Sequence, residues 1–310
     1  MKKEEFYFKS VSGLADIHAA KYLPDDGNVK AVLQVAHGMA EHLERYEKLA
    51  EYLCDNGVAL YINDHLGHGK SVSSDSELGY FGKEDGWKNF IEDCHQLTEI
   101  AKKENEGVPY VFFGHSMGSF VARAYSYKYA ADIDGAVFCG TAGTNPMAGM
   151  GKVVAGLIAK VKGDHHRSKL IDKLSFGAYN KRTEGRTPFD WLSKDTENVD
   201  KYLADDKCGF LFTSTGSKDL VSLLSFVSSK EWYNGFTKNL PVLLIAGGED
   251  PVGAYGEGVK EVNDKLKNAG VKDVSMKLYN GYRHEILNET EIFEEVASDV
   301  LAFVKRVCNI

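Results

Sequence analysis

The sequence predicts an α/β fold in which a doubly wound, mostly parallel sheet carries helices on both faces. Short and continuously apolar runs recur along the chain, as is typical of strands buried on both faces of a parallel sheet. Longer amphipathic stretches separate these runs, so that strands and helices alternate. With 310 residues, 43% of them hydrophobic, the chain is long enough for one large domain of this kind with an insertion.

The first element is an expected antiparallel strand pair over residues 4–24, whose apolar residues alternate weakly around Gly13 at an edge of the sheet. Buried strands are expected at 31–36 (AVLQVA), 58–62 (VALYI), 109–113 (PYVFF), 135–139 (GAVFC), 241–246 (PVLLIA) and 274–279 (VSMKLY). Helices are expected at 44–55, 87–105, 117–130, 256–269 and 290–307. The last helix opens with a capping-box pattern, in which Asn288 is followed three residues later by Glu291.

One stretch, residues 144–229, interrupts the alternation because no strand is expected in it. A structureless loop of that length is improbable in a compact domain, so the stretch is predicted to be a helical insertion. The core then comprises residues 1–143 and 230–310. Within the insertion, 150–161 (MGKVVAGLIAKV) carries its apolar residues on one helical face. This face either lines a ligand channel or packs on the core.

Composition excludes several classes of protein. The net charge of −8 argues against a nucleic-acid binder, which usually carries a basic excess. No apolar run approaches the roughly 20 residues that span a bilayer, and the first residues lack the apolar region of a secretory signal. The five cysteines are scattered without a C-x-x-C pair, which indicates reduced thiols and neither a disulfide framework nor a zinc site. We therefore expect a cytoplasmic protein.

The segment "VFFGHSMGSF" at 111–120 places Ser116 between two glycines, directly after a buried strand and before a helical stretch. A tight surface turn is one interpretation of this pattern. The context favours a nucleophile elbow, in which a sharp strand-to-helix turn exposes the serine hydroxyl. Gly114 and Gly118 fit this interpretation, because side chains there would clash with the neighbouring strand and helix.

A serine hydroxyl needs a base to remove its proton, and the base needs a carboxylate that holds one tautomer. Asp250 follows the strand in "PVLLIAGGEDPVG", and His284 follows the next strand in "MKLYNGYRHEILNE". Both lie where parallel strands end, at the edge that carries ligand sites in open α/β sheets. Asp250 could instead start a turn and His284 could cap a helix, and Glu249 is a rival acid. The shared position behind an elbow serine favours a triad of Ser116, Asp250 and His284.

The oxyanion of an acyl-transfer intermediate needs N–H donors. The residue after the nucleophile, Met117, offers one, and Met39 in "AHGMAEHLERY" is the natural second. A metal site through His37 and His42 is the alternative for this loop. Its spacing matches no zinc motif and the sequence places no cysteine near it, so we expect no metal and no organic cofactor.

Five segments together resemble the monoacylglycerol lipase and lysophospholipase group of serine α/β-hydrolases: HGMAEHLERY, NDHLGHGKS, GHSMGS, GGEDPVG and YRHEILNE. The resemblance covers residues 15–306 and is weakest in the insertion. It implies an α/β-hydrolase fold with Ser116 as nucleophile, His284 as base, Asp250 as its acid, and the N–H groups of Met39 and Met117 as oxyanion hole. It also implies that 144–229 is the cap and that the histidines and glycines of 65–69 are structural.

The resemblance makes a carboxylester hydrolase of single-chain lipids the leading functional hypothesis, with a small-molecule ester or lipid as substrate. Such a cap could also touch a membrane surface transiently. A proline-releasing aminopeptidase shares the same plan but would need an acidic cap residue to hold the substrate amine, and Glu184, Glu197 and Asp200 are candidates. A non-catalytic binding protein is disfavoured because every catalytic element is present.

Overall fold

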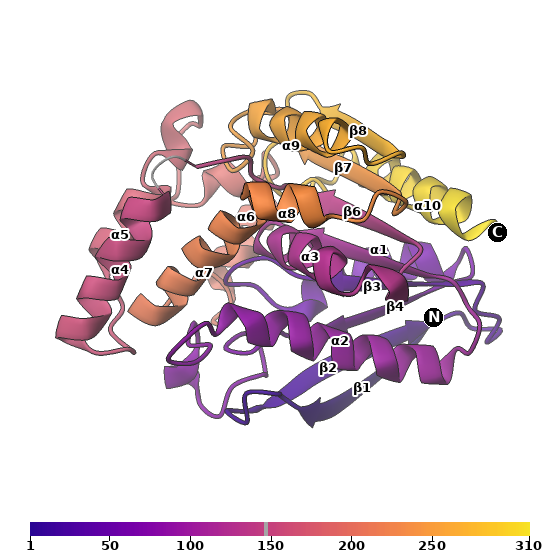
Figure 1. The fold of residues 1–310 in the computed structure, drawn as a ribbon, viewed down its shortest axis with the longest axis horizontal. Coiled ribbons are helices and arrows are strands. Elements are labelled where there is room, and N and C mark those ends of the chain that lie inside the picture. Colours follow the sequence, from indigo (N-terminus) through magenta and orange to yellow (C-terminus); the bar gives the residue numbers. More distant parts are fainter. Residues whose placement is uncertain (146–147) are drawn as a thin grey trace.

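Residues 1–145 and 148–310 are described by the computed structural model, and their arrangement is drawn in Figure 1. One sheet holds the strands β1 (Lys2–Lys9), β2 (Asp16–Leu23), β3 (Ala31–Ala36), β4 (Val58–Asn63), β5 (Tyr110–His115), β6 (Gly135–Cys139), β7 (Val242–Gly247) and β8 (Val274–Tyr279). Their order is β1-β2-β4-β3-β5-β6-β7-β8. The pairs β1–β2 and β2–β4 are antiparallel, and all others are parallel. The predicted α/β-hydrolase fold with its antiparallel N-terminal edge is therefore confirmed.

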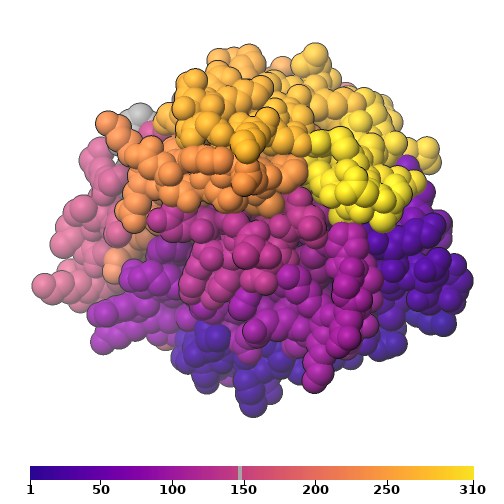
Figure 2. Space-filling model, turned by 45° about the vertical axis from the view of Figure 1, so that its right-hand side comes forward, coloured from indigo at the N-terminus to yellow at the C-terminus, as the bar shows by residue number. Residues whose placement is uncertain are grey.

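Helices cover both faces of the sheet, because the central strands are buried on both sides. Apolar residues of α1 (Glu47–Cys54) and α10 (Phe293–Cys308) pack on one face. Those of α2 (Trp87–Glu104), α3 (Met117–Lys128), α8 (Lys230–Gly235) and α9 (Glu257–Asn268) pack on the other. Figure 2 shows this second face closely filled, with the orange residues of α8 directly against magenta residues. Short 3₁₀ turns lie at Leu43–Tyr46, Asp75–Glu77, Ala130–Asp132, Tyr179–Arg182 and Asp190–Leu192.

The segment between β6 and β7 contains α4 (Ala148–Lys162), α5 (Lys169–Phe176), α6 (Thr196–Ala204) and α7 (Ser214–Val227). Its described residues form no strand of the sheet, only an isolated bridge between Arg167 and Thr213. In Figure 1 the pair α4 and α5 lies farthest from the sheet, with α7 between α4 and the core. We call residues 144–229 the helical insertion. None of the helices in the described ranges is long and apolar enough to cross a bilayer.

Arg123 of α3 contacts both of the connections between the helical insertion and the core. The guanidinium is fully buried and donates to the carbonyl oxygens of Ala142 at 2.9 Å and Val227 at 2.6 Å. It also stacks on the Trp232 ring, 4.7 Å from the centroid. Burial lowers the pKa of Arg123. The side chain therefore satisfies buried carbonyls on both connections between insertion and core.

The predicted capping box before the last helix is wrong. Helix α10 begins at Phe293, and its N-cap, Ile292, makes no side-chain hydrogen bond. The chain instead turns at Glu289, whose carboxylate accepts the N–H groups of Lys194 and Asp195 from the helical insertion. At the start of α10 the N–H groups of Ile292 and Phe293 donate to the backbone carbonyl of Glu289, with no side-chain cap.

The expectation that the apolar residues of 150–161 form one buried helical face is also wrong. Helix α4 packs on α7 through its small residues, of which Ala155 and Ala159 are buried. Four of the large apolar residues point outward instead: Met150, Val153, Leu157 and Val161 are each at least half exposed. Leu170 and Leu174 of α5 are similarly exposed. We call these six residues the apolar strip.

Asp219 of α7 is a buried carboxylate whose environment makes the stability of the protein depend on pH. Its Oδ2 has no hydrogen-bond partner among the described residues, and burial raises its pKa to about 7. Nearby charges come from Lys218, Lys152 and Asp85. The folded protein therefore binds a proton that the unfolded chain, with an Asp pKa of about 3.9, has already released. The contribution of Asp219 to stability is therefore fully present below about pH 4 and is lost as the pH rises to about 7.

Asp219→Asn should therefore raise the free energy of unfolding by about 1–3 kcal/mol at pH 8, with little gain near pH 4. Urea unfolding at both pH values measures the difference. Asp85→Asn is the control, since Asp85 is exposed and is one of the charges near Asp219. An equal gain at both pH values would contradict the assigned cause.

Candidate active site

Ser116 occupies a strained turn between β5 and α3. Its backbone has φ 54° and ψ −122°, an unusual conformation for a residue other than glycine. A Cβ at Gly114 would lie 2.0 Å from the carbonyl oxygen of Gly118, and a Cβ at Gly118 would lie 2.0 Å from that of Ala36. Both glycines are therefore required for strand, turn and helix to pack, and the turn leaves Ser116 partly exposed.

Asp250 and His284 lie together at the carboxyl ends of β7 and β8. Nδ1 of His284 lies 2.9 Å from Oδ2 of Asp250, and both side chains are buried. The second oxygen of Asp250 accepts the N–H of Val252 at 2.8 Å. Because a carboxylate oxygen only accepts, the proton of the ring sits on Nδ1. Nε2 then presents a lone pair, and it has no hydrogen-bond partner among the described residues.

The His284 ring is held next to the serine turn. Its centroid lies 4.8 Å from that of His115, the residue before Ser116, and 5.2 Å from the indole ring of Trp191 in the helical insertion. A Cβ at Gly140, where β6 ends, would lie 3.1 Å from Cε1 of His284. The ring is thus enclosed by core and insertion, with Nε2 as its unpaired polar atom.

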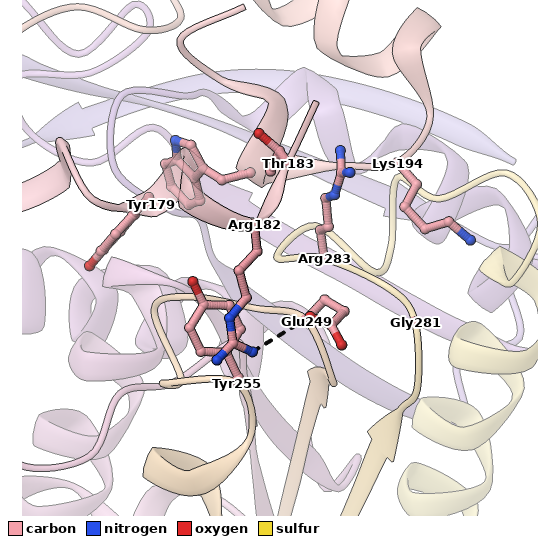
Figure 3. A pocket seen from close by; sticks show the side chains of 9 residues that line it. Tyr179, Arg182, Thr183, Lys194, Glu249, Tyr255, Gly281 and Arg283 are labelled. Atoms are coloured by element: carbon pink, nitrogen blue, oxygen red, sulfur yellow. Dashed lines mark ion pairs between the residues drawn. The ribbon is translucent and has the colours of Figure 1, made fainter. Parts of the chain in front are cut away.

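Glu249, the rival acid, points elsewhere. Figure 3 shows it on the wall of a cavity of about 180 Å³ between the insertion and the loops after β7 and β8. Its carboxylate is half exposed and lies 3.9 Å from the guanidinium of Arg182, which stacks on Tyr255. No contact with His284 is present among the described residues. The structure therefore brings Asp250, and not Glu249, to the ring.

The two proposed oxyanion donors are unpaired. Met117 is the first residue of α3, where backbone N–H groups lack partners within the helix. Met39 lies in the loop after β3, next to Gly38, and a Cβ on Gly38 would lie 3.2 Å from Cβ of Ser116. Within the described ranges neither N–H donates a hydrogen bond. Both are therefore available to an acceptor beside the serine.

A buried ionic network, which the sequence analysis missed, fixes the loop that carries Met39. Glu41 accepts the N–H of Gly38 at 2.5 Å and the guanidinium of Arg45 at 2.6 Å. Arg45 also makes two bonds of 2.7 Å to Glu285, the residue after His284. Burial alone would raise the pKa of Glu41, but Arg45 and His115 hold it well below its usual value. Glu41 and Arg45 do lie in the motif HGMAEHLERY, but their partner Glu285 is 240 residues away.

The metal site considered through His37 and His42 does not form, because both nitrogens of His37 are already used. Nδ1–H donates to the carbonyl oxygen of Gly38 at 2.8 Å, and Nε2 accepts the N–H of His65 at 2.9 Å. Burial lowers the pKa of His37. The expectation that no cysteine lies near His42 is wrong, since His42 lies beside Asp205 and Cys208. All five cysteines are free.

The histidines and glycines of 65–69 pack next to the loop that carries Met39. His68 is buried and stacks on Phe81, with ring centroids 5.5 Å apart, and burial lowers its pKa to about 3. A Cβ at Gly69 would lie 2.3 Å from the carboxylate of Asp64. The segment is thus a tightly packed loop after β4, and His65 contacts His37 of the loop after β3.

Comparisons with known proteins agree with this geometry. The family model described as serine aminopeptidase, S33, matches residues 27–291. A monoacylglycerol lipase of Mycolicibacterium smegmatis is 27% identical over 304 residues, which are 97% of this chain and 98% of that protein. Human monoglyceride lipase is 26% identical over 290 residues, 92% and 86% of the two chains.

Among solved structures, a thermostable carboxyl esterase from Bacillus coagulans, crystallised with glycerol, is 30% identical and superposes with a TM-score of 0.93 over 99% of each chain. Its sheet and helices thus correspond to those of this chain over nearly their whole length. Because the family model also covers well over half of the sequence, the chain belongs to the serine aminopeptidase S33 family of α/β-hydrolases.

Proposed function

We propose that the chain is a serine hydrolase that cleaves carboxylic esters of single-chain lipids, of the monoacylglycerol or lysophospholipid type. The relatives support a carboxylester hydrolase. The observation that carries the proposal is the buried pair of His284 and Asp250, whose Nε2 is unpaired beside the strained Ser116 turn. This is the arrangement that a base of a serine nucleophile requires.

In the proposed mechanism, Oγ of Ser116 attacks the ester carbonyl while Nε2 of His284 takes its proton. Asp250 holds the ring and stabilises the imidazolium, and the N–H groups of Met39 and Met117 receive the oxyanion. Collapse of the intermediate expels the alcohol, which takes the proton from Nε2, and leaves an acyl-enzyme on Ser116. Water, activated by the same histidine, then releases the fatty acid. An alcohol in place of water would give acyl transfer, which product analysis distinguishes.

The experiment that tests this function is a panel of substrates. It contains p-nitrophenyl esters of increasing chain length, monoacylglycerols, lysophospholipids and aminoacyl-naphthylamides. Highest kcat/KM on a single-chain lipid ester is the expected result. Preference for an acetate ester or for an aminoacyl substrate would contradict the proposed substrate class.

The aminopeptidase alternative draws support from the description of the family model. A substrate amine would need a free carboxylate from the cap. The three candidates are exposed and already paired with cations: Glu184 with Arg283, Glu197 with Lys201, and Asp200 with Arg186. The ester hydrolase is therefore the better supported function.

We further propose that residues 144–229 act as the cap and that the apolar strip lets this cap contact a membrane surface transiently. Exposed apolar side chains on two adjacent helices form a larger apolar surface than single exposed leucines do. Insertion of such side chains into a lipid interface gains free energy in proportion to the apolar area buried. A lipid substrate would be taken up from that surface.

Replacing Leu157 and Leu174 of the strip by glutamine should weaken activity on long-chain monoacylglycerol in vesicles by about 30-fold, because each leucine contributes on the order of 1 kcal/mol at the interface. Activity on soluble butyrate esters should stay unchanged, since neither side chain lies near Ser116 in the proposed site. Initial rates with both substrates, together with vesicle co-sedimentation, measure the effect. Lys160→Gln, also exposed on α4, is the control. Equal losses on both substrates would mean that the strip supports the fold.

Turnover should need no metal, because nucleophile, base, acid and oxyanion donors all belong to the chain. Dialysis of the purified protein against a chelator should leave kcat on a soluble ester unchanged within error. A loss of kcat that zinc restores without any change in thermal stability would show that a metal takes part in the reaction.

A further inference from the structure

A second cluster of polar side chains lies between the oxyanion loop and the helical insertion. It consists of His42, Asp205 and Cys208, and in the described part of the chain it is the single group of this kind. One atom of each residue, the Nε2, a carboxylate oxygen and the Sγ, lies within 4.8 Å of the others. The proposed mechanism uses none of the three.

The two backbone segments are held together without these side chains. Gly209 N–H and the Tyr202 hydroxyl both donate to the carbonyl oxygen of Ala40, each at 3.0 Å. Ala40 itself has a φ of 51°, so the loop is fixed in an unusual conformation. The positions of His42 and of the turn at 205–208 are therefore set before any ligand binds, which lowers the entropic cost of binding one.

The turn at 205–208 aims its carboxylate at the histidine. Oδ1 of Asp205 accepts the N–H of Lys207 at 2.8 Å, and the backbone carbonyl of Asp205 accepts the N–H of Cys208 at 2.9 Å. Oδ2 is left to face Nε2 of His42 at 2.8 Å. The oxygen that faces the cluster is thus a fixed acceptor.

Imidazole nitrogen, carboxylate oxygen and thiolate sulfur are the donor types that zinc prefers. Ligand atoms around a tetrahedral zinc lie about 3.3–3.8 Å apart, so a side-chain adjustment of roughly 1 Å brings the three into place. Coordination by a divalent cation removes the thiol proton of Cys208. The nearest cations are already paired, Lys207 with Asp75 and Arg45 with Glu285, so they do not compete for the cluster.

We propose that His42, Asp205 and Cys208 bind a zinc ion that fastens the helical insertion to the oxyanion loop. On binding, the proton that His42 Nε2 shares with Asp205 moves through the solvent to Nδ1 of the same ring, which frees the Nε2 lone pair. Zn²⁺ then accepts lone pairs from Nε2, Oδ2 and Sγ, the S–H bond breaks, and one proton passes to the solvent. Water completes the fourth position. The ion takes no part in the reaction of the triad. It links the segment after α6 to the loop that carries Met39.

The test uses Co²⁺ and Zn²⁺ on the metal-free, full-length protein carrying Ser116→Ala, so that turnover plays no part. Cobalt should give a thiolate-to-metal charge-transfer band in the near ultraviolet and the visible bands of a tetrahedral site. Zinc should displace it, release about one proton per ion, and raise the Tm. Cys208→Ser should remove the charge-transfer band, and His42→Asn should weaken zinc at least tenfold.

Asp206→Asn is the matched control, because Asp206 is exposed in the same turn and is not one of the three ligands. It should bind zinc as the parent does. A cobalt complex without the charge-transfer band, or zinc binding that survives both Cys208→Ser and His42→Asn, would overturn the site. The cobalt spectrum of the parent decides thiolate ligation even if a variant does not fold. Ester hydrolysis is measured separately on the protein that keeps Ser116. A failure of the proposed ester hydrolase function can therefore be told apart from a failure of the zinc site.

Discussion

Ser116→Ala should lower kcat on any ester substrate by about 10⁶-fold, to the level left by oxyanion donors and binding alone. The methyl group cannot attack a carbonyl, and no other hydroxyl is proposed to reach the position opposite Nε2 of His284. A fluorophosphonate probe should label the wild-type protein at Ser116 and leave the variant unlabelled. Stability should be little changed, because the strained φ of 54° is imposed by the surrounding packing and not by the hydroxyl.

Ser119→Ala is the matched control for this prediction. Ser119 lies one turn into α3, is buried, and its hydroxyl donates to the carbonyl oxygen of Ser116 at 2.6 Å. It shares the local surroundings but points into the helix, so its loss should cost on the order of 1 kcal/mol in stability and leave the probe reaction intact. Labelling of the Ser116→Ala protein, or its retained turnover, would overturn the proposed nucleophile.

The sheet could be predicted from sequence because its strands are buried on both faces and therefore appear as unbroken apolar runs. The run at 31–36 matches β3 residue for residue, whereas the run at 109–113 begins one residue before β5 and omits its last two residues, Gly114 and His115. Gly114 and His115 continue the strand into the turn, where the close packing of strand and helix requires a glycine. Apolarity alone could not indicate that extension.

The helical insertion was harder to predict because an apolar pattern shows an amphipathic helix but not which face its neighbours cover. In α4 the small residues Ala155 and Ala159 allow close approach to α7, while Leu157 and Val161 remain outside. The same limit applies to the segment before α10, where the carboxylate of Glu289 accepts backbone N–H groups of residues 194 and 195 from the insertion. Both outcomes depend on tertiary contacts.

The candidate site also contains residues that the local sequence indicates and others that only tertiary contacts bring together. Ser116, Asp250 and His284 stand in local motifs at strand ends, so chain order was enough to select them. The Glu41–Arg45–Glu285 network joins residues 240 positions apart, and the pair of His42 and Asp205 spans 163 positions. No local pattern marks such partners, because their roles arise only when β3, α6 and the loop after β8 meet at one edge of the sheet.

Asp250→Asn should lower kcat by about 10⁴-fold while leaving the protein folded. The amide oxygen of the new side chain can still accept the N–H of Val252, so the turn after β7 keeps its bond. The amide nitrogen, however, donates and cannot accept the proton of Nδ1. The ring then carries its proton on Nε2, the atom that should receive the proton of Ser116, and loses its function as a base. Steady-state kinetics together with thermal unfolding separate this loss from a loss of structure.

Glu249→Gln is the control, since Glu249 precedes Asp250 in the chain but pairs with Arg182 at 3.9 Å on the cavity wall. Half exposed and weakly paired, it should change kcat by less than about threefold, because such surface pairs contribute roughly 0–1 kcal/mol. The tautomer argument adds a sharper readout than rate alone: a higher pH should not restore Asp250→Asn, because the neutral ring of His284 then carries its proton on the wrong nitrogen. A larger loss in Glu249→Gln than in Asp250→Asn would show that the carboxylate 2.9 Å from His284 is not the one that orients it in catalysis.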